Sequence, residues 1–207
     1  MAREIVKKVQ NGILYSDGSI RIDNVRASYP HLDKMYQAPP GKDGKQSAPA
    51  FSIVGMLDKK THVAVKDLIV EVMNGIQKEK DTKVAKDKKF IRDGDDGDKL
   101  EYEGYWTVSA RETRRPSVRH RNGVPMTEKE IQDIIYAGCR VNILVNPWFQ
   151  DNDFGKRINS NLLAVQFVRD DEQIGQARID DEGVFDPIDG DDDDGMGGSS
   201  GGDDDDL

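Results

Sequence analysis

The stretch "YAGCRVNILVNPWFQDNDFGKRINSNLLAVQFVRD", residues 136–170, decides the fold because it predicts two strands with a polar connection between them. Its first part carries β-branched residues at every second position from Val141 to Val145, which predicts a strand over residues 139–149. A second strand is predicted over residues 161–170, and the polar residues in between predict a turn or a β-hairpin. This pair of strands favours a β-rich fold.

Outside this stretch, the sequence predicts three more strands and two helices. The strands are expected at residues 19–29, 50–58 and 105–112, and the helices at residues 60–80 and 127–138. Thr127 and Glu130 form a capping box that opens the second helix, and Gly138 can end it. The chain therefore predicts a mainly β domain with helical insertions (α+β) over residues 1–175. The five-stranded Greek-key barrel of the OB-fold is the natural candidate, although periodicity alone does not separate it from other β-rich folds.

A charged segment, "DTKVAKDKKFIRDGDDGDKLEYEG", interrupts this pattern at residues 81–104. We expect it to be a mobile, solvated insert, and the sequence assigns it no role. Its acidic run, residues 93–98, has the composition of a calcium-binding loop. Gly104, however, stands where such a loop carries its closing glutamate, so no metal site is expected there.

The sequence offers little that could support catalysis. The three histidines, His31, His62 and His120, have no metal-binding spacing, and there is no phosphate-binding glycine loop or nucleophile elbow. The one cysteine, Cys139, cannot form an intrachain disulfide and is expected to be a small core residue. We therefore expect a protein that is not an enzyme and uses no cofactor.

Basic and aromatic residues are interleaved in two segments. The loop "RETRRPSVRHR" directly follows the strand that begins with two aromatics, and "NPWFQDNDFGKR" combines three aromatics with two cations. Single-stranded nucleic acid is bound by this mixture, because cations contact phosphates and aromatic rings accept unstacked bases. The candidates for phosphate contacts are Arg26, Arg111, Arg114, Arg115, Arg119, Arg121, Lys156 and Arg157. The candidates for base stacking are Tyr105, Trp106, Trp148, Phe149 and Phe154, with Tyr29 and Tyr36 as secondary candidates.

Each of these features also has an interpretation without a ligand. Tyr105 and Trp106 are neighbours on a strand and face opposite ways, so one of them is expected in the core. Trp148 follows Pro147 at a strand end and could equally plug a barrel. Phe154 lies in a polar turn, which favours a stacking or partner role. The arginine-rich loop could be a solvated surface.

The charge of the chain is divided between two parts of opposite sign. The whole chain has 30 basic and 39 acidic residues, a net charge of −9. Residues 170–207 contain 16 of the acids and a single base, Arg178, so this segment carries −15 and the remainder carries +6. The ending "GDDDDGMGGSSGGDDDDL" has too few apolar residues to offset its ordering entropy. Residues 176–207 are therefore predicted to form a disordered acidic tail, and the asymmetry indicates nucleic-acid binding or an interaction tail.

Two blocks of the sequence resemble a known family. They are "IDNVRASYPHL" and the stretch from Tyr136 to Gly175. The matching residues are Asn24, Arg26, Ser28, Tyr29, Pro30, Tyr136, Gly138, Cys139, Val141, Asn142, Asn146, Pro147, Gly155, Leu162, Val165 and Gln166. The pattern resembles a family of phage single-stranded DNA-binding proteins with an OB-fold, of the enterobacterial-phage type once known as a domain of unknown function. The resemblance covers residues 20–175 and implies non-catalytic coating of single-stranded DNA with little sequence preference.

The acidic tail looks like the tails of single-strand binding proteins of T7-like phages. Those tails end in an aromatic residue or in proline-phenylalanine, whereas this one ends in Leu207. The resemblance implies a tail that competes with DNA for the basic surface of its own body and, once displaced, recruits replication or recombination proteins. The residues expected to contact such a partner are Asp203, Asp204, Asp205, Asp206 and Leu207.

Several alternatives stay open at this point. The protein could anneal complementary strands in recombination, or it could be an acidic decoy or interaction module; a metal-dependent nuclease is disfavoured. A homodimer is left open. The start of the chain resembles no signal peptide, and no apolar run approaches the ~18 residues of a membrane span, so the bacterial host cytoplasm is the expected location. Phage DNA replication, recombination or repair is the expected context.

Overall fold

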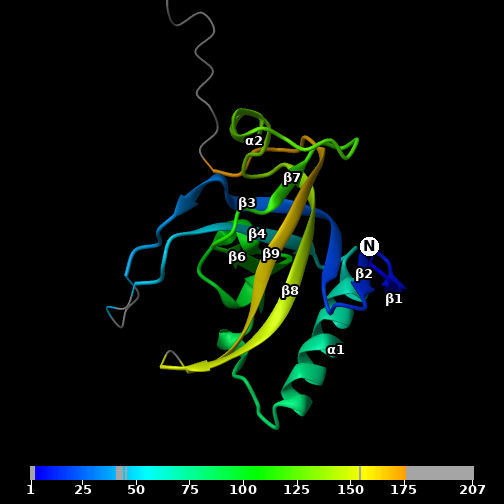
Figure 1. The fold of residues 1–207 in the computed structure, drawn as a ribbon, viewed down its shortest axis with the longest axis vertical. Coiled ribbons are helices and arrows are strands. Elements are labelled where there is room, and N and C mark those ends of the chain that lie inside the picture. Colours follow the sequence, from blue (N-terminus) through cyan, green and yellow to red (C-terminus); the bar gives the residue numbers. More distant parts are fainter. Residues whose placement is uncertain (1–2, 41–43, 45, 154, 176–207) are drawn as a thin grey trace, which may run out of the picture. The chain divides into compact units, whose positions relative to one another are not determined.

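The computed structural model describes residues 3–40, 44, 46–153 and 155–175. These residues form nine strands and two helices (Figure 1). The strands are β1 (Ile5–Val9), β2 (Gly12–Tyr15), β3 (Ile20–Tyr36), β4 (Ala50–Asp58), β5 (Ile91–Asp93), β6 (Tyr105–Glu112), β7 (Ser117–Arg119), β8 (Arg140–Asn152) and β9 (Gly155–Arg169). The helices are α1 (Val63–Glu79) and α2 (Glu128–Ile134). The predicted acidic tail and Phe154 lie outside the described residues.

Five of the strands close into a barrel. β3 pairs antiparallel with both β4 and β8, β4 pairs with β6, and β8 pairs with β9. The barrel is closed by a parallel contact of β6 with β9, at the single pair Arg111 and Asn161. The prediction of a mainly β, five-stranded OB-fold-like barrel with helical insertions is confirmed.

The barrel interior follows the alternation that the sequence predicted. Val141, Ile143 and Val145 of β8 are all fully buried. Cys139, next to the start of β8, is also fully buried, and burial raises the pKa of its thiol to about 11. The prediction that this cysteine is a core residue is therefore confirmed.

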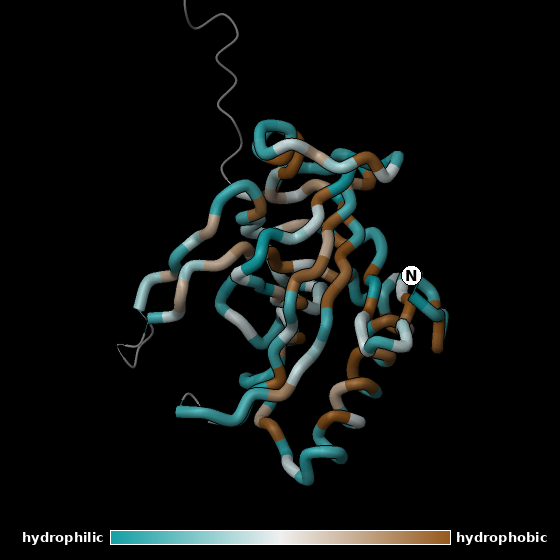
Figure 2. Tube along the Cα trace, viewed as in Figure 1, coloured by the Kyte–Doolittle hydropathy of each residue, from teal (hydrophilic) through white to brown (hydrophobic). Residues whose placement is uncertain are grey.

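Helix α1 packs its apolar stripe against the barrel and the β1–β2 hairpin. Val65, Leu68, Ile69 and Met73, at helical spacing, are the buried residues of this helix. Figure 2 shows the resulting alternation of hydrophobic and hydrophilic residues along α1, and the hydrophilic far end of the β8–β9 hairpin. The helix begins at Val63, slightly later than predicted.

The structure differs from the predicted elements at several places, among them the short strand β7 inside the arginine-rich loop and the start of β9 at Gly155 rather than at residue 161. Strand β3 continues through Pro30 to Tyr36, beyond the predicted end at residue 29. The N-terminal residues form the β1–β2 hairpin, for which no element was predicted. Helix α2 has the predicted capping box of Thr127 and Glu130 but ends at Ile134, before Gly138.

The charged insert has secondary structure that the sequence did not predict. It contains β5 and three 3₁₀ turns, at Lys86–Lys88, Gly94–Asp96 and Leu100–Tyr102. Phe90 and Ile91 are 5% and 8% exposed, and β5 pairs with β6. This apolar pair attaches the insert to the barrel, while most of its residues are exposed, in agreement with a solvated segment.

The buried imidazole of His62 predicts a stability that depends on pH. The ring is 1% exposed, with Nε2 at 3.0 Å from the carbonyl oxygen of Asp23 and Nδ1 at 2.8 Å from the Thr61 hydroxyl. Burial lowers the pKa of His62 below its usual value. The neutral ring thus stabilises the fold above about pH 6.5, and this contribution is lost as the pH falls below that value, where the unfolded chain binds the proton.

We expect the urea midpoint to fall between about pH 7.5 and about pH 5.5, and to fall less in a His62→Gln variant. Each midpoint is compared with that of the same variant at the higher pH, so a general loss of stability in the variant does not affect the test. An equal fall in both proteins would contradict the role given to His62.

Candidate nucleic-acid interface

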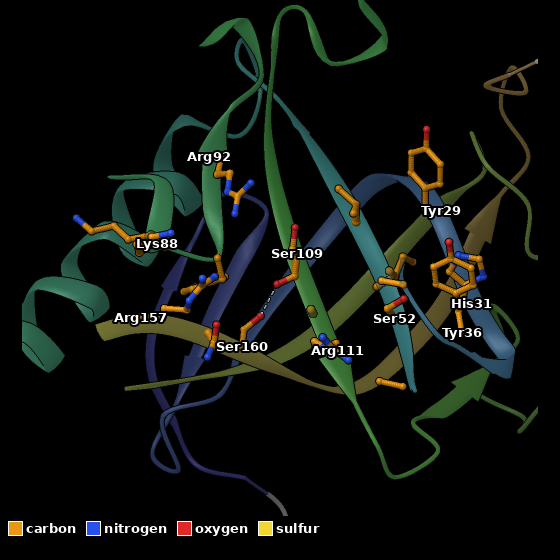
Figure 3. Close-up of a pocket in the computed structure, with 18 residues that line it drawn as sticks. Tyr29, His31, Tyr36, Ser52, Lys88, Arg92, Ser109, Arg111, Arg157 and Ser160 are labelled. Carbon is orange, nitrogen blue, oxygen red and sulfur yellow. Dashed lines mark hydrogen bonds between the residues drawn. The ribbon is translucent and has the colours of Figure 1, made fainter. Parts of the chain in front are cut away.

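An open groove of about 420 Å³ crosses the outer surface of the barrel (Figure 3). Its lining comes from β4, β6 and β9, from the second half of β3, and from the charged insert. In OB-folds the second and third strands, together with the loops after the first and fourth strands, form the surface that binds oligonucleotides. β4 and β6 are the second and third strands of this barrel, so the groove lies on that surface.

The floor of the groove is made of small polar side chains. Ser52 of β4 and Ser109 of β6 line the groove, and their buried neighbours Ile53 and Ala110 also contribute to its lining. The hydroxyl of Ser160 donates to the carbonyl oxygen of Ser109 at 2.9 Å, which joins β9 to β6 where their ladder is short. These small side chains leave room for a flat ligand.

One side of the groove is an aromatic wall, which consists of Tyr29, His31 and Tyr36. The rings of His31 and Tyr36 stack with centroids 4.2 Å apart and planes inclined by 9°. Tyr29 and Tyr36 are 49% and 44% exposed. Tyr29 adopts a positive φ of 45°, and the ammonium of Lys99 lies 4.0 Å from its ring centroid. Flat rings held at an exposed surface suit the stacking of unpaired bases.

The opposite side is a basic wall, which consists of Lys88, Lys89, Arg92 and Arg157. Figure 3 shows Lys88, Arg92 and Arg157 together on one side of Ser109 and Ser160, with the aromatic wall on the other side. The first three of these cations come from the insert, and Lys89 forms a bridge with Ile158 of β9. The arrangement places positive charge along one edge of the groove and ring faces along the other.

Of the arginine-rich loop, the structure brings only Arg111 to the groove, where its guanidinium donates to the carbonyl oxygen of Ala48 at 2.6 Å. Arg115 lies over the Phe51 ring and contacts Glu128 at 3.1 Å. Arg119 and Arg121 line two other hollows of the described surface, and Arg114 lies in the exposed turn between β6 and β7. The predicted cluster is therefore spread over several surfaces.

Arg26 contacts the segment that follows β9. Its guanidinium donates to the carbonyl oxygens of Glu172 at 2.5 Å and of Gly138 at 3.5 Å. Arg140 pairs with Asp171 at 2.5 Å in the same region, and this contact lowers the pKa of the Asp171 carboxyl. These bonds hold residues 171–174 against the barrel, and Arg26 is not among the residues that line the groove.

The predicted stacking residues also separate. Trp106 packs against the core, with the ammonium groups of Lys59 and Lys66 at 5.9 Å and 5.2 Å from its ring. Phe149 packs against the core as well, and Tyr105 is half-buried at the start of β6. Trp148 is 41% exposed.

Trp148 lies close to the groove by its register. It stands directly opposite Asn159, which lines the groove, so both side chains point to the same face of the β8–β9 ladder. Arg157 stands opposite Gln150 on that face. Lys156 donates to the Thr82 hydroxyl at 3.1 Å and belongs to the same hairpin.

Sequence reasoning missed His31 and the three cations of the insert. The signal for the insert was present in "KDKKFIRD", where Phe90 and Ile91 interrupt a run of charges. An apolar pair in such a run indicates attachment to a core, and the cations beside it are then held at the protein surface. No sequence signal marked His31, because the predicted strand ended at Tyr29 and the structure extends it to Tyr36.

Among the described residues, no group of three or more His, Cys, Asp or Glu side chains could hold a metal ion. No helix in the part of the chain that the structure describes is long and apolar enough to cross a membrane.

The model of the family described as "Enterobacter phage Enc34, ssDNA-binding protein" matches residues 18–196. The chain belongs to this family. Its members are named for binding DNA rather than for a reaction, in agreement with a protein that is not an enzyme.

Solved structures of the single-stranded DNA-binding protein from bacteriophage Enc34 are similar to this chain. One is 41% identical and has a TM-score of 0.76, with 90% of this chain and all of that chain covered. A second, in complex with ssDNA, is 44% identical with a TM-score of 0.76, and covers 84% of this chain and 98% of that chain.

More distant similarities agree with the fold. Gp2.5, a single-stranded DNA-binding protein encoded by bacteriophage T7, is 11% identical with a TM-score of 0.54, and covers 87% of this chain and 98% of that chain. At this identity the likeness concerns the fold alone. Protein p50 of Acyrthosiphon pisum secondary endosymbiont phage 1 is 41% identical over 78 residues, which are 36% of this chain and 41% of that protein.

Proposed function

We propose that this protein coats single-stranded DNA by holding it in the groove between the aromatic and basic walls. The observation that carries the proposal is the position of these two walls, which face each other across the oligonucleotide-binding surface of an OB-fold. Phosphates lie along Lys88, Lys89, Arg92, Arg111 and Arg157, and bases stack on Tyr29, Tyr36 and Trp148. Family membership supports this assignment.

The chemistry of the groove favours binding with little sequence preference. Every base has a stacking face, and each stacked base contributes about 1–3 kcal/mol. Cations contact phosphates without regard to sequence, and the counterions that they release make the affinity strongly dependent on salt. A duplex keeps its bases stacked inside and cannot offer them to the aromatic wall, so single strands are preferred.

The acidic tail is proposed to regulate this groove. With 13 acids and one base over residues 176–207, a net charge of −12, the tail competes with DNA phosphates for the basic wall. DNA displaces it, and Asp203–Asp206 with Leu207 then contact replication, recombination or repair proteins in the host cytoplasm. The tail lies outside the described residues, so charge complementarity is its support.

The first experiment is a fluorescence anisotropy titration of labelled oligo-dT with the full chain and with a chain that ends at Gly175. This end point retains residues 171–174, which Arg26, Tyr136 and Arg140 bind. We expect both proteins to prefer the single strand to duplex of equal length. The shorter protein should bind more tightly, with the larger difference at low salt, because the competition is electrostatic.

If neither protein binds the single strand, the groove is not a DNA site, and an interaction module becomes the better interpretation. If both proteins bind equally at every salt concentration, the groove remains the DNA site and the tail does not compete with DNA. If the protein also accelerates the pairing of complementary strands, it has an annealing activity in addition to binding.

The two tryptophans provide a separate test of the groove. We expect oligo-dT to quench the fluorescence of a Trp106→Phe variant, in which Trp148 is the single tryptophan, because a stacked base lies against the indole. The matched Trp148→Phe variant should show little quenching and bind almost as tightly, because its ring can still stack, whereas Trp148→Ala should lose about 1–3 kcal/mol of binding free energy. Quenching that follows Trp106 instead would remove Trp148 from the DNA path.

A further inference from the structure

The charged insert presents a contradiction between its composition and its position. Residues 81–104 contain eight acidic and six basic residues, so the insert as a whole is negative. Its cations Lys88, Lys89 and Arg92 nevertheless line the groove. Two of its acids contact groove residues, Asp87 at Lys88 and Glu101 at Tyr29. Three others pair with lysines that do not line the groove: Asp93 and Asp95 with Lys59, and Asp96 with Lys86.

Lys59, in the turn that follows β4, binds two of these acids at once. Its ammonium donates to Asp95 at 2.6 Å and to Asp93 by a shorter contact. Lys59 is not among the residues that line the groove. It lies next to Trp106, with its ammonium 5.9 Å from the centroid of that ring. Both carboxyls have a lowered pKa, and for Asp95 the largest cause is the bond from Lys59.

The same two carboxylates also shape the backbone of the insert. Asp93 accepts from the backbone N–H of Asp95 at 3.1 Å and begins a 3₁₀ turn, and Asp95 accepts from the backbone N–H of Gly104 at 2.8 Å. The backbone N–H of Lys59 donates to the carbonyl oxygen of Gly104 at 3.1 Å. Gly94, between the acids, approaches Tyr102 so closely that a Cβ would lie 2.1 Å from its carbonyl oxygen.

The position of the insert matters because it covers a weak seam of the barrel. β6 and β9 are joined at one residue pair, and the insert lies at this junction through the pairing of β5 with β6 and the bridge from Lys89 to Ile158. Asp93 is the last residue of β5, and Arg92 precedes it. A bond that holds Asp93 therefore also holds the backbone from which the Arg92 side chain extends.

We propose that Lys59, Asp93 and Asp95 form a clamp that positions the cations of the insert on the DNA groove without contacting DNA. The proposal rests on the proposed function, because it assigns the means by which the basic wall is held. In this role the three clamp residues are positioning residues, and the groove cations are the ones that touch phosphate.

The clamp and simple electrostatics predict effects of opposite sign. Removing two negative charges near a DNA site should strengthen binding if charge alone matters. If the acids hold the basic wall in place, the same change should weaken binding. The double variant Asp93→Asn/Asp95→Asn separates these outcomes, since the amide oxygens still accept from the N–H groups of Asp95 and Gly104.

We expect this double variant to bind oligo-dT about tenfold more weakly than the unmodified chain at low salt. Its slope of log affinity against log salt should be shallower by about 1, because cations that are no longer held in place lose one or two phosphate contacts. The matched control is Asp67→Asn/Glu71→Gln on α1, which removes two exposed acids whose partners are Lys66 and Lys7. The control should bind as tightly as the unmodified chain or slightly more tightly.

Lys59 gives the reciprocal test. Lys59→Met should reproduce the loss of affinity, and Lys59→Arg should restore it, because a guanidinium can bind both carboxylates. A readout without DNA accompanies these titrations. Limited trypsin digestion should cut the insert faster in Lys59→Met and in the double variant than in the unmodified chain, since the backbone around Lys86, Lys88 and Lys89 unfolds locally more often.

The outcomes distinguish the clamp from the function on which it rests. If the unmodified chain binds no single-stranded DNA, the proposed function fails, and the trypsin comparison still decides whether the clamp exists. If the unmodified chain binds and the double variant binds equally or more tightly, the clamp is overturned. Unchanged trypsin digestion of the insert would overturn it independently.

Discussion

Replacing Lys88, Arg92 and Arg157 together by alanine is expected to weaken the binding of oligo-dT by roughly two orders of magnitude at low salt. These three cations belong to the basic wall, and Figure 3 shows them on one side of the groove. Each phosphate contact on a single strand contributes about 0.7 to the slope of log affinity against log salt, so the slope should become shallower by about 2. Anisotropy titrations between about 50 and 200 mM salt measure both quantities.

The control for this prediction comes from the arginine-rich loop. The triple variant Arg114→Ala, Arg119→Ala and Arg121→Ala removes the same number of positive charges from residues that do not line the groove. We expect a loss of less than about tenfold, which reflects the lower overall positive charge. A larger loss in the loop variant than in the groove variant would mean that the DNA follows the loop and that the groove is secondary.

The arginine-rich loop illustrates why proximity in sequence did not define the interface. Arg111 lies on β6 beside the groove, but β7 pairs with the far part of β9, at Ala164 to Gln166. The chain crosses from one part of the barrel to another between these strands. A cluster of charges that spans such a crossing is divided between two surfaces. No periodic pattern in the sequence indicates where the chain crosses.

The barrel itself could be predicted because the patterns that indicate its strands involve residues close together in the sequence. Alternation of apolar residues identified β4, β6, β8 and most of β9, and the capping box identified the start of α2. These signals depend on residues a few positions apart. They remain valid whatever the rest of the chain does.

The missed parts depend on contacts between distant residues. Tyr36 belongs to β3 because its strand passes Pro30 and pairs with Ala50, and Tyr29 turns outward by a positive φ that no propensity predicts. The insert is fixed by Lys59, more than thirty residues before Asp93. The aromatic and basic walls are both built by such pairings. The sequence therefore predicted the class of ligand, single-stranded nucleic acid, but only some of the residues that line the groove.

Gly138→Ala is expected to destabilise the fold by about 3 kcal/mol. Gly138 has a φ of +114°, and a Cβ at this position would lie 2.1 Å from the carbonyl oxygen of Glu172. The left-handed backbone costs about 1–2 kcal/mol for a residue with a side chain, and the contact with a backbone oxygen adds about 1–3 kcal/mol. For a chain of this size, the thermal midpoint should fall by about 6–12 °C, as measured by circular dichroism.

The matched control is Gly75→Ala, in the exposed middle of α1. A Cβ there meets no atom within 4 Å, so the alanine gains helix propensity and should stabilise the fold by up to about 1 kcal/mol. The two substitutions add the same methyl group and should shift the midpoint in opposite directions. An unchanged midpoint in Gly138→Ala would mean that residues 171–174 move away without loss, and that the bonds from Arg26 and Arg140 do little to hold the segment that leads into the acidic tail.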